Sequence, residues 1–200
     1  MTSLRHNPEE DRSPRDFYLD AARDCILDVG WRHTTLTEVA RRAGVSRMTI
    51  YRTWADMPAL LGDLMTREWS GLVTQVQAGK HDASDPLTVL RTDVVLLVQR
   101  LRCNELFMRI VELDPELILP YLFARRGRSQ DAVLAILSAT IRDGQKSGAI
   151  RRGDPAMLAR TILLAAQGFV LSAQTMVDDD VSLSQLDSEL ERLVEWVLAP

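Results

Sequence analysis

Apolar residues recur every three or four positions along most of this 200-residue chain, which is the spacing of one buried helical face. Several of these stretches follow a helix start signal, in which a capping side chain stands near a proline of the first turn. Ser13-Pro14, Asp56 with Pro58, and Asp154-Pro155 are three such starts. The pattern therefore predicts an all-α fold. The helices are expected over about residues 14–29, 36–43, 47–54, 57–77, 87–101, 104–113, 115–125 with a break at Pro120, 129–147, 155–177 and 183–197.

Residues 35–54 show the pattern of two short helices joined by a tight turn. Thr35 can cap the first helix, with Glu38 three residues later completing a capping box. Gly44 follows the last apolar position of that helix, where a left-handed residue commonly ends a helix, and Ser46 is the next N-cap. This arrangement is typical of a helix-turn-helix. Its inward positions are Leu36, Val39, Ala40, Ala43, Ile50 and Trp54.

The outward positions of the second helix suit the major groove of DNA. They are Arg47, Met48, Thr49, Tyr51 and Arg52. Arginine can bond guanine, threonine can bond a base edge and methionine can touch a thymine methyl, whereas Tyr51 and Arg52 are better placed for phosphates. Between Trp31 and Ala55 five arginines face one acid, a local charge of +4, although the whole chain carries -4. This excess favours DNA binding; the alternative is a solvated arginine-rich surface on an ordinary helical hairpin.

A family resemblance rests on the same residues. Four segments carry it: Thr34-Thr35-Leu36-Thr37-Glu38-Val39-Ala40, Ala43-Gly44-Val45-Ser46, Thr49-Ile50-Tyr51 with Trp54, and Pro58-Ala59-Leu60-Leu61. At this spacing, over about residues 15–65, the sequence resembles the N-terminal domain of TetR-family transcriptional regulators. The resemblance implies a dimer whose C-terminal domain binds a small effector and thereby releases DNA.

The resemblance also implies roles position by position. Thr35 and Tyr51 match phosphate contacts, while base-reading positions are matched by Arg47, Met48 and Thr49. Two positions depart from the family pattern: Thr37 stands where many members carry arginine, and Met57 stands where a lysine often binds phosphate. These departures bear on operator affinity more than on the fold. The residues expected to contact DNA are Thr35, Thr37, Arg47, Met48, Thr49, Tyr51 and Arg52.

The chain is expected to divide into three parts. Residues 1–12 are polar with an acidic run and are expected to be disordered. Residues 13–56 make an N-terminal three-helix helix-turn-helix DNA-binding domain, and residues 57–200 make a C-terminal helical ligand-binding and dimerisation domain. The long helix over 57–77 links the two and is the natural lever for a ligand signal.

The C-terminal part offers candidates for an effector site. An apolar pocket lined by them would suit a hydrophobic ligand, although an ordinary core position is the alternative for each. The candidates for the apolar lining are Trp69, Phe107, Met108, Tyr121, Phe123 and Phe169. The candidates for polar residues that orient the ligand are Arg109, Gln167 and Gln174.

Two C-terminal helices carry more apolar surface than one chain is expected to cover. The helix over 155–177, which includes Phe169, is apolar on nearly all sides, and this predicts burial by a partner chain as well as by its own core. In the last helix, apolar residues alternate in steps of three and four, as in a coiled-coil seam, at Leu183, Leu186, Leu190, Leu193 and Val197. We expect these helices to form an intersubunit four-helix bundle in a twofold homodimer; the alternative is packing within one chain.

Composition narrows the remaining classes. With no apolar run near 18 residues and no signal peptide, we expect no membrane span and a cytoplasmic location. Cys25 and Cys103 lie among apolar helix positions and are expected to be inert thiols. His6, His33 and His81 are scattered, and there is no nucleophile motif or phosphate-binding glycine loop. The sequence therefore predicts no metal, no cofactor and no enzyme.

The sequence as a whole predicts a DNA-binding transcriptional regulator, a repressor that a small, largely hydrophobic effector releases from a palindromic operator. Its expected partners are double-stranded DNA, a second copy of the chain and an unidentified effector. The alternative is an architectural or partner-binding dimer whose helix-turn-helix lacks operator specificity.

Overall fold

The computed structural model describes residues 13–79 and 85–200, and these form helices and their connections without a strand. The all-α prediction is confirmed, while the tail expected over 1–12 lies outside the described residues. The elements are α1 (Pro14–Val29), η1 (Trp31–His33), α2 (Leu36–Arg42), α3 (Arg47–Thr53), α4 (Met57–Gln77), α5 (Pro86–Arg102), α6 (Glu105–Leu113), η2 (Pro115–Leu117), α7 (Leu119–Phe123), α8 (Arg128–Ser147), α9 (Pro155–Ser172), η3 (Ala173–Met176) and α10 (Leu183–Leu198).

Most helices begin at the caps that the sequence indicates. Ser13, Asp56 and Asp154 each accept a hydrogen bond from a backbone N–H of the helix that follows. The helix predicted over 115–125 is instead two short pieces, η2 and α7, because Pro120 in the first turn of α7 has no N–H to donate to a preceding turn. The end of the predicted helix over 155–177 winds more tightly as η3.

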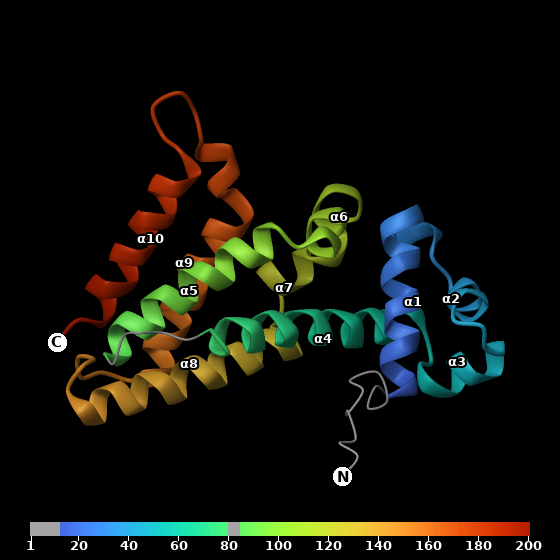
Figure 1. The fold of residues 1–200 in the computed structure, drawn as a ribbon, viewed down its shortest axis with the longest axis horizontal. Helices are drawn as coiled ribbons and strands as arrows, with labels where there is room; N and C mark the ends of the chain where they lie inside the picture. The colour runs from blue at the N-terminus through green and yellow to red at the C-terminus, as the bar shows by residue number, and fades with distance from the viewer. Residues whose placement is uncertain (1–12, 80–84) are drawn as a thin grey trace, which may run out of the picture.

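The first hydrophobic core gathers α1, α2 and α3 against the start of α4 and against α6. In Figure 1, α1 crosses α4 at a steep angle, with α2 and α3 on its far side. The helix α6 contributes Leu106 and Ile110, which are 0% and 2% exposed. We call this cluster the N-terminal core, and its buried members are Leu19, Ala21, Ala22, Cys25, Ile26, Leu36, Val39, Ala40, Ala43, Ile50, Trp54, Leu60, Leu64, Leu106 and Ile110.

A second hydrophobic core, the C-terminal core, joins α5, α8, α9 and α10. Its buried members are Leu87, Leu90, Val94, Val98, Ile141, Ile150, Leu158, Ala159, Ile162, Leu190, Val194 and Leu198. At its edge Asp187 of α10 accepts hydrogen bonds from Arg102 and Gln99 of α5, the latter at 2.8 Å. The Arg102 and Asp187 side chains are 9% and 10% exposed, so the loss of either would leave a buried charge unpaired and destabilise the junction of α5 and α10.

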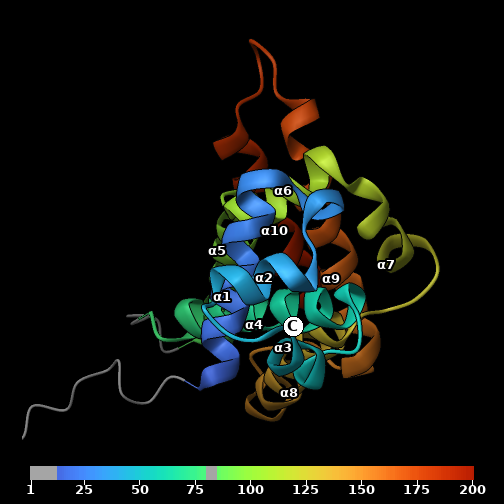
Figure 2. The ribbon, with the colours of Figure 1, turned by 90° about the vertical axis from the view of Figure 1, so that its right-hand side faces the viewer.

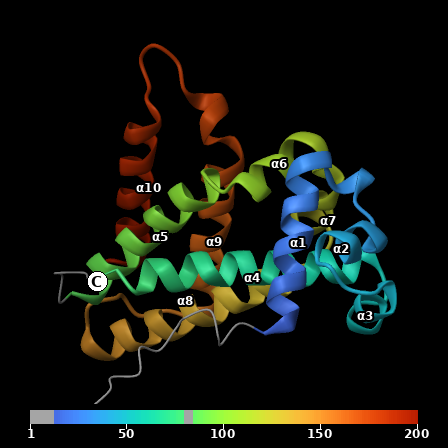
Figure 3. The same ribbon diagram turned by 45° about the vertical axis from the view of Figure 1, so that its right-hand side comes forward.

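The long helix α4 belongs to both halves of the molecule. Its first half places Leu60 and Leu64 in the N-terminal core, and its last turns place Val76 against α5 and α8. Figures 1 and 3 show α8 running alongside α4 toward the same end of the molecule. The helix α4 therefore connects α5 and α8 at one end with the core that holds α3 at the other.

Alanine substitutions at two glycines distinguish the cost of a left-handed backbone from the effect of adding a methyl group in a helix. At Gly44, with φ +67°, and at Gly71 inside α4, a Cβ atom would meet nothing within 4 Å. Gly44→Ala should lower the free energy of unfolding by about 1–2 kcal/mol, the cost of a left-handed L-residue. Gly71→Ala should raise it by up to about 1 kcal/mol, because alanine favours a helix over glycine. Urea unfolding followed by circular dichroism measures both, and effects of the same sign would contradict this account.

Candidate nucleic-acid interface

The turn between α2 and α3 is fixed by caps and by backbone hydrogen bonds. Thr35 and Ser46 each accept, at 3.2 Å, a hydrogen bond from the backbone N–H three residues ahead, as the sequence predicts for two N-caps. Gly44 adopts the left-handed φ of +67°. The N–H of Val45 then donates to the carbonyl of Ala40 at 3.0 Å, so α3 starts at a set angle to α2.

The inward side of α3 is anchored in the N-terminal core. Ile50 and Trp54 are 0% and 3% exposed, which confirms the inward positions predicted for them. The Trp54 ring packs edge-on against Tyr18 of α1, with 6.4 Å between centroids, and lies 5.4 Å from the guanidinium of Arg15. Its indole N–H donates to Asp63 of α4 at 2.7 Å. These contacts turn the opposite side of α3 toward solvent.

Figure 2 looks onto the end of the molecule that carries α2 and α3. On α3, Met48 is 74% exposed and Tyr51 is 48% exposed. Thr49 is half-buried, and its hydroxyl lies 2.9 Å from the hydroxyl of Ser46, so it shares a hydrogen bond with the cap. The solvent side of α3 thus offers a flexible apolar tip and a phenol beside it.

The two positions that depart from the family pattern differ in their surroundings. Thr37 is half-buried on α2, whereas Thr35 at the start of that helix is exposed. Met57 packs against the N-terminal core at the first position of α4. Met57 therefore makes an apolar contact with the core at the position where many family members carry a phosphate-binding lysine.

The structure lowers the free positive charge that the sequence count indicates. Three of the five arginines between Trp31 and Ala55 form ion pairs: Arg32 with Asp114 and Glu116, Arg41 with Glu38, and Arg42 with Asp28. Within the described ranges, Arg47 and Arg52 take part in no ion pair, and both are exposed. Of these five arginines, the two that are left without an acidic partner are therefore both on α3.

Glu38 does not complete the predicted capping box. Its carboxylate accepts two hydrogen bonds from Arg41, at 3.0 Å from Nε and 2.6 Å from Nη2. These hydrogen bonds hold the pKa of Glu38 below its ordinary value. A two-pronged arginine is the stronger partner because both groups are charged, so Thr35 alone caps α2.

Asp63 of α4 joins three other elements at the end of α3. One carboxylate oxygen accepts from Trp54 and from Arg15 of α1, and the other accepts from Arg128, the first residue of α8. Partial burial raises the pKa of Asp63, but the hydrogen bonds from Arg128, Trp54 and Arg15 outweigh it and bring the pKa below its ordinary value. No local sequence pattern singles out Asp63, because its partners lie 9 to 65 residues away.

A second carboxylate ties the corner before α2 to α6 and η2. Asp114, which is 2% exposed, accepts a hydrogen bond from the backbone N–H of Trp31 at 3.0 Å and pairs with Nε of Arg32 at 3.2 Å. Arg32 also pairs with Glu116 at 2.7 Å. The corner that leads into Thr35 is therefore held from the C-terminal half of the chain.

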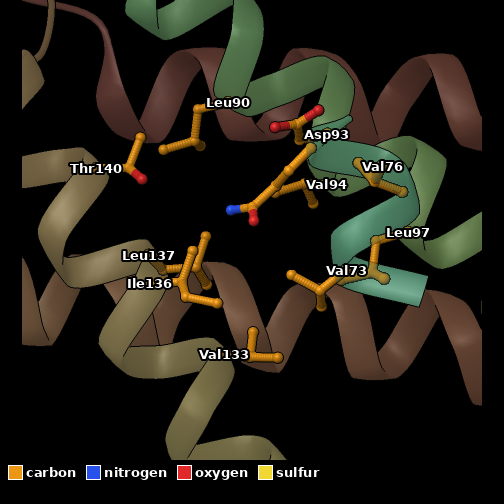
Figure 4. Close-up of a pocket in the computed structure, with 11 residues that line it drawn as sticks. Val73, Val76, Leu90, Asp93, Val94, Leu97, Val133, Ile136, Leu137 and Thr140 are labelled. Carbon is orange, nitrogen blue, oxygen red and sulfur yellow. The ribbon is translucent and has the colours of Figure 1, made fainter. Parts of the chain in front are cut away.

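A partly open cavity lies between α4, α5 and α8 (Figure 4). It encloses about 70 Å³, or about 490 Å³ when the space of its open mouth is included. Eight of its lining residues are aliphatic and none is aromatic, while Gln77, Asp93 and Thr140 supply polar groups. The aliphatic lining is Val73, Val76, Leu90, Val94, Leu97, Val133, Ile136 and Leu137.

The structure does not bring the sequence candidates for a ligand pocket together, and none of them borders this cavity. Phe107 of α6 is buried but belongs to neither hydrophobic core, and it stacks edge-on against Trp69 of α4. Tyr121 and Phe123 lie on the surface of α7, and Phe169 packs against the C-terminal core. The remaining candidates, half-buried or exposed on α6, α9 and η3, are Met108, Arg109, Gln167 and Gln174. Large aromatic side chains indicated burial but not which cluster each would join.

The residues expected at a dimer interface differ in accessibility. Leu190 is fully buried inside one chain, on the side of α10 that also carries Val194 and Leu198, so it belongs to the intrachain core and is closed to a second chain. The apolar residues spaced three and four apart along α10 therefore do not all lie on one side of the helix. The other expected residues are half-buried: Phe169, Leu183, Leu186, Leu193 and Val197.

The outer sides of α9 and α10 expose large apolar side chains. Met157, Leu164 and Trp196 are 61%, 69% and 77% exposed. The segment Pro155–Met176 has a mean hydropathy of 1.5 and is long and apolar enough, by length and composition, to cross a membrane. This finding corrects the expectation that the chain has no segment of this kind. Arg160 is the only charged residue between Pro155 and Met176.

Comparison with known proteins agrees with this geometry. The model of the family described as bacterial regulatory proteins, tetR family, matches residues 19–64, which hold most of α1 and all of α2 and α3. A helix-turn-helix transcriptional regulator of Mycobacterium tuberculosis is 35% identical over 180 residues, covering 90% of this chain and 92% of the relative. One from Mycobacterium bovis matches over the same shares.

Solved structures share the fold over nearly the whole chain. A TetR-family transcriptional regulator from Pectobacterium atrosepticum has a TM-score of 0.73 at 20% identity, covering 98% of this chain and 99% of that one. The SmeT–triclosan complex has a TM-score of 0.65 at 18% identity, covering 94% and 93%. SmeT is the repressor of the Stenotrophomonas maltophilia multidrug efflux pump SmeDEF.

The stabilising role of Asp63 should depend on pH. Since its folded pKa lies below the ordinary value of 3.8, its ionised form stabilises the fold above that value, and this contribution is lost as the pH falls through the lowered pKa. Asp63→Asn should therefore cost about 2 kcal/mol at pH 7, where charge-assisted hydrogen bonds are lost, and less at pH 3. Urea unfolding across this range measures the difference.

Asp143→Asn is the matched control, because Asp143 pairs with Lys146 on the open surface of α8. It should have a smaller effect than Asp63→Asn at pH 7. A loss for Asp63→Asn that stays constant from pH 7 to pH 3 would contradict the assigned pKa direction.

Proposed function

Because this chain belongs to the TetR family of bacterial transcriptional regulators, we propose that it is a homodimeric repressor that a small aliphatic effector releases from a near-palindromic operator. The observation that carries the DNA-binding part is the solvent side of α3. There the unpaired Arg47 and Arg52 stand beside the exposed Met48 and Tyr51, on a helix whose other side is buried. As a protein that works on DNA it acts in the cytoplasm.

Each side chain of this surface has a defined task in the proposal. Arg47 donates two hydrogen bonds to a guanine edge, and Met48 or the methyl of Thr49 touches a thymine methyl. Tyr51, Arg52 and Thr35 bind phosphates and set the register, with Thr37 beside them on α2. Base contacts select the operator, while phosphate contacts contribute affinity for any duplex.

A dimer accounts for the exposed apolar sides of α9 and α10. Leu164 and Trp196 would lie in the interface of a four-helix bundle built from α9 and α10 of two chains, with Leu186 and Leu193 at its edge. Such an interface also covers the apolar segment Pro155–Met176, of which 22% is buried in one chain. Two copies of α3 related by a twofold axis would enter successive major grooves about 34–36 Å apart, which calls for a near-palindromic site.

The effector is proposed to bind in the cavity between α4, α5 and α8. An aliphatic lining with a few polar groups suits a flexible apolar molecule that carries a hydrogen-bonding group for Gln77 or Thr140. SmeT, which shares the fold, has a solved structure as a complex with triclosan. Release of DNA requires that the effector bind the DNA-incompetent state more tightly than the competent one.

Selection of duplexes from a random-sequence pool at near-physiological salt should enrich a near-palindrome. Arg47→Ala should then relax the preference at one base pair of each half-site and cost about 1–3 kcal/mol of binding free energy. Tyr51→Phe should weaken binding to all duplexes alike. Fluorescence anisotropy with the selected operator and single-base variants measures both effects.

Arg142→Ala is the matched control, because Arg142 is an exposed arginine of α8 far along the chain from α3. It should leave operator preference unchanged. Retention of duplexes without enrichment would favour the architectural alternative, which the names of the relatives do not support. Unchanged preference in Arg47→Ala would remove Arg47 from the reading surface.

Leu164→Glu should convert a dimer of two 22.5 kDa chains into monomers without unfolding them, because Leu164 is 69% exposed in one chain. Light scattering at micromolar concentration measures the mass, and circular dichroism checks helix content. Phe123→Glu is the control, since Phe123 is 83% exposed on α7, away from the proposed interface. A mass of one chain for the unsubstituted protein would rule out the dimer.

A further inference from the structure

The helix α8 carries both a wall of the cavity and a contact with the end of α3. Val133, Ile136, Leu137 and Thr140 line the cavity, and Figure 4 shows them on one side of the helix. Arg128, the first residue of the same helix, pairs with Asp63. Only about 7.5 Å of helix axis separates Val133 from Arg128, at 1.5 Å per residue.

Asp63 connects that arginine to α3. It accepts the indole N–H of Trp54, the residue that ends α3, at 2.7 Å, and it also binds Arg15 of α1. The Asp63 side chain is 14% exposed, whereas that of Arg128 is 66% exposed, so the carboxylate is fixed and the arginine is the movable partner. Among hydrogen bonds and ion pairs of the described residues, Arg128–Asp63 is the one that joins α8 to α1, α3 or α4.

We propose that Arg128 is a positioning residue through which the position of α8, set by what fills the cavity, is transmitted to α3. Outward movement of α8 by an effector withdraws the guanidinium from Asp63. The carboxylate then redistributes its hydrogen bonds between Trp54 and Arg15, and the end of α3 changes its position against α4. The proposal rests on the proposed function, since it makes the cavity the effector site.

This route is distinct from a tilt of α4 as a rigid lever. If α4 acted as a lever, α1, α2 and α3 would move because α4 moves, whichever residue stands at position 128. In the route through Arg128, α8 acts on α3 through Asp63 of α4. Removal of the Arg128 guanidinium then uncouples the cavity from α3. Hydrogen bonds suit such a role because they weaken steeply with distance and angle.

The test uses a wedge in the cavity in place of an unidentified effector. Val133→Phe adds a ring to the cavity wall of α8 and is combined with Arg128→Gln or, as the matched control, with Arg126→Gln. Arg126 is also an exposed arginine of the connector before α8, but it pairs with Asp131 of α8 itself. The readout is the indole N–H signal of Trp54 in the ¹H–¹⁵N spectrum of the full chain, one of four indole signals, assigned by single Trp→Phe replacements.

Arg128→Gln alone should shift the Trp54 signal, and Arg126→Gln should leave it in place. Val133→Phe should shift the signal in the Arg126→Gln background but by less than about a third as much in the Arg128→Gln background. With the selected operator, the wedge should weaken binding about 10-fold when Arg128 is present, within the usual range of allosteric coupling, and less than about 2-fold when it is absent.

An equal response to the wedge in both backgrounds would overturn the proposal, because the signal would then pass through α4 or α6. The indole readout needs no DNA, so failure to select an operator would refute the proposed function while the relay is still tested. If Val133→Phe collapses the four indole signals into one unresolved cluster, the milder Val133→Leu takes its place with the same two outcomes.

Discussion

The helix α3 is too short to stand alone, and the rest of the N-terminal half answers that constraint. It has seven residues, whereas isolated helices below about 12–15 residues are marginal in water. Its geometry therefore depends on a cap at Ser46 and on the burial of Ile50 and Trp54. The buried side leaves Arg47 and Met48 outside, so the same packing that makes α3 stable also determines what it presents to DNA.

How much of this was predictable depends on the distance along the chain over which each feature is encoded. The caps at Thr35 and Ser46 and the left-handed Gly44 are local signals, and the structure confirms them. Ion pairs that close over 65 to 84 residues, such as Arg128 with Asp63 or Arg32 with Glu116, leave no periodic trace in the sequence. The local charge of +4 overstates the unpaired positive charge for the same reason, because the acids that pair with Arg32 and Arg42 lie outside residues 31–55.

The sequence candidates for the effector site lie away from the cavity for a different physical reason. Aromatic side chains are large and are buried wherever the fold has room for them, so Phe107 packs against Trp69 and Phe169 packs against the C-terminal core. The cavity lies instead where aliphatic sides of α4, α5 and α8 meet without filling the space between them. Periodicity predicts which side of a helix turns inward, but it does not predict how well three such sides interdigitate.

Polar links between the halves matter because of how they respond to displacement. The helices α1, α2 and α3 are fixed to α6 by apolar contacts of Leu106 and Ile110. They are also fixed by Asp114, which is 2% exposed and binds Trp31 and Arg32. Among the hydrogen bonds and ion pairs of the described residues, the link to α8 is the ion pair of Asp63 with the largely exposed Arg128. Apolar packing tolerates small shifts with little loss of contact, whereas a hydrogen bond to a fixed carboxylate is lost over about an ångström. A regulator that must hold its reading helix firmly and yet release it needs both kinds of link, and the chain provides the firm one at α6 and the breakable one at α8.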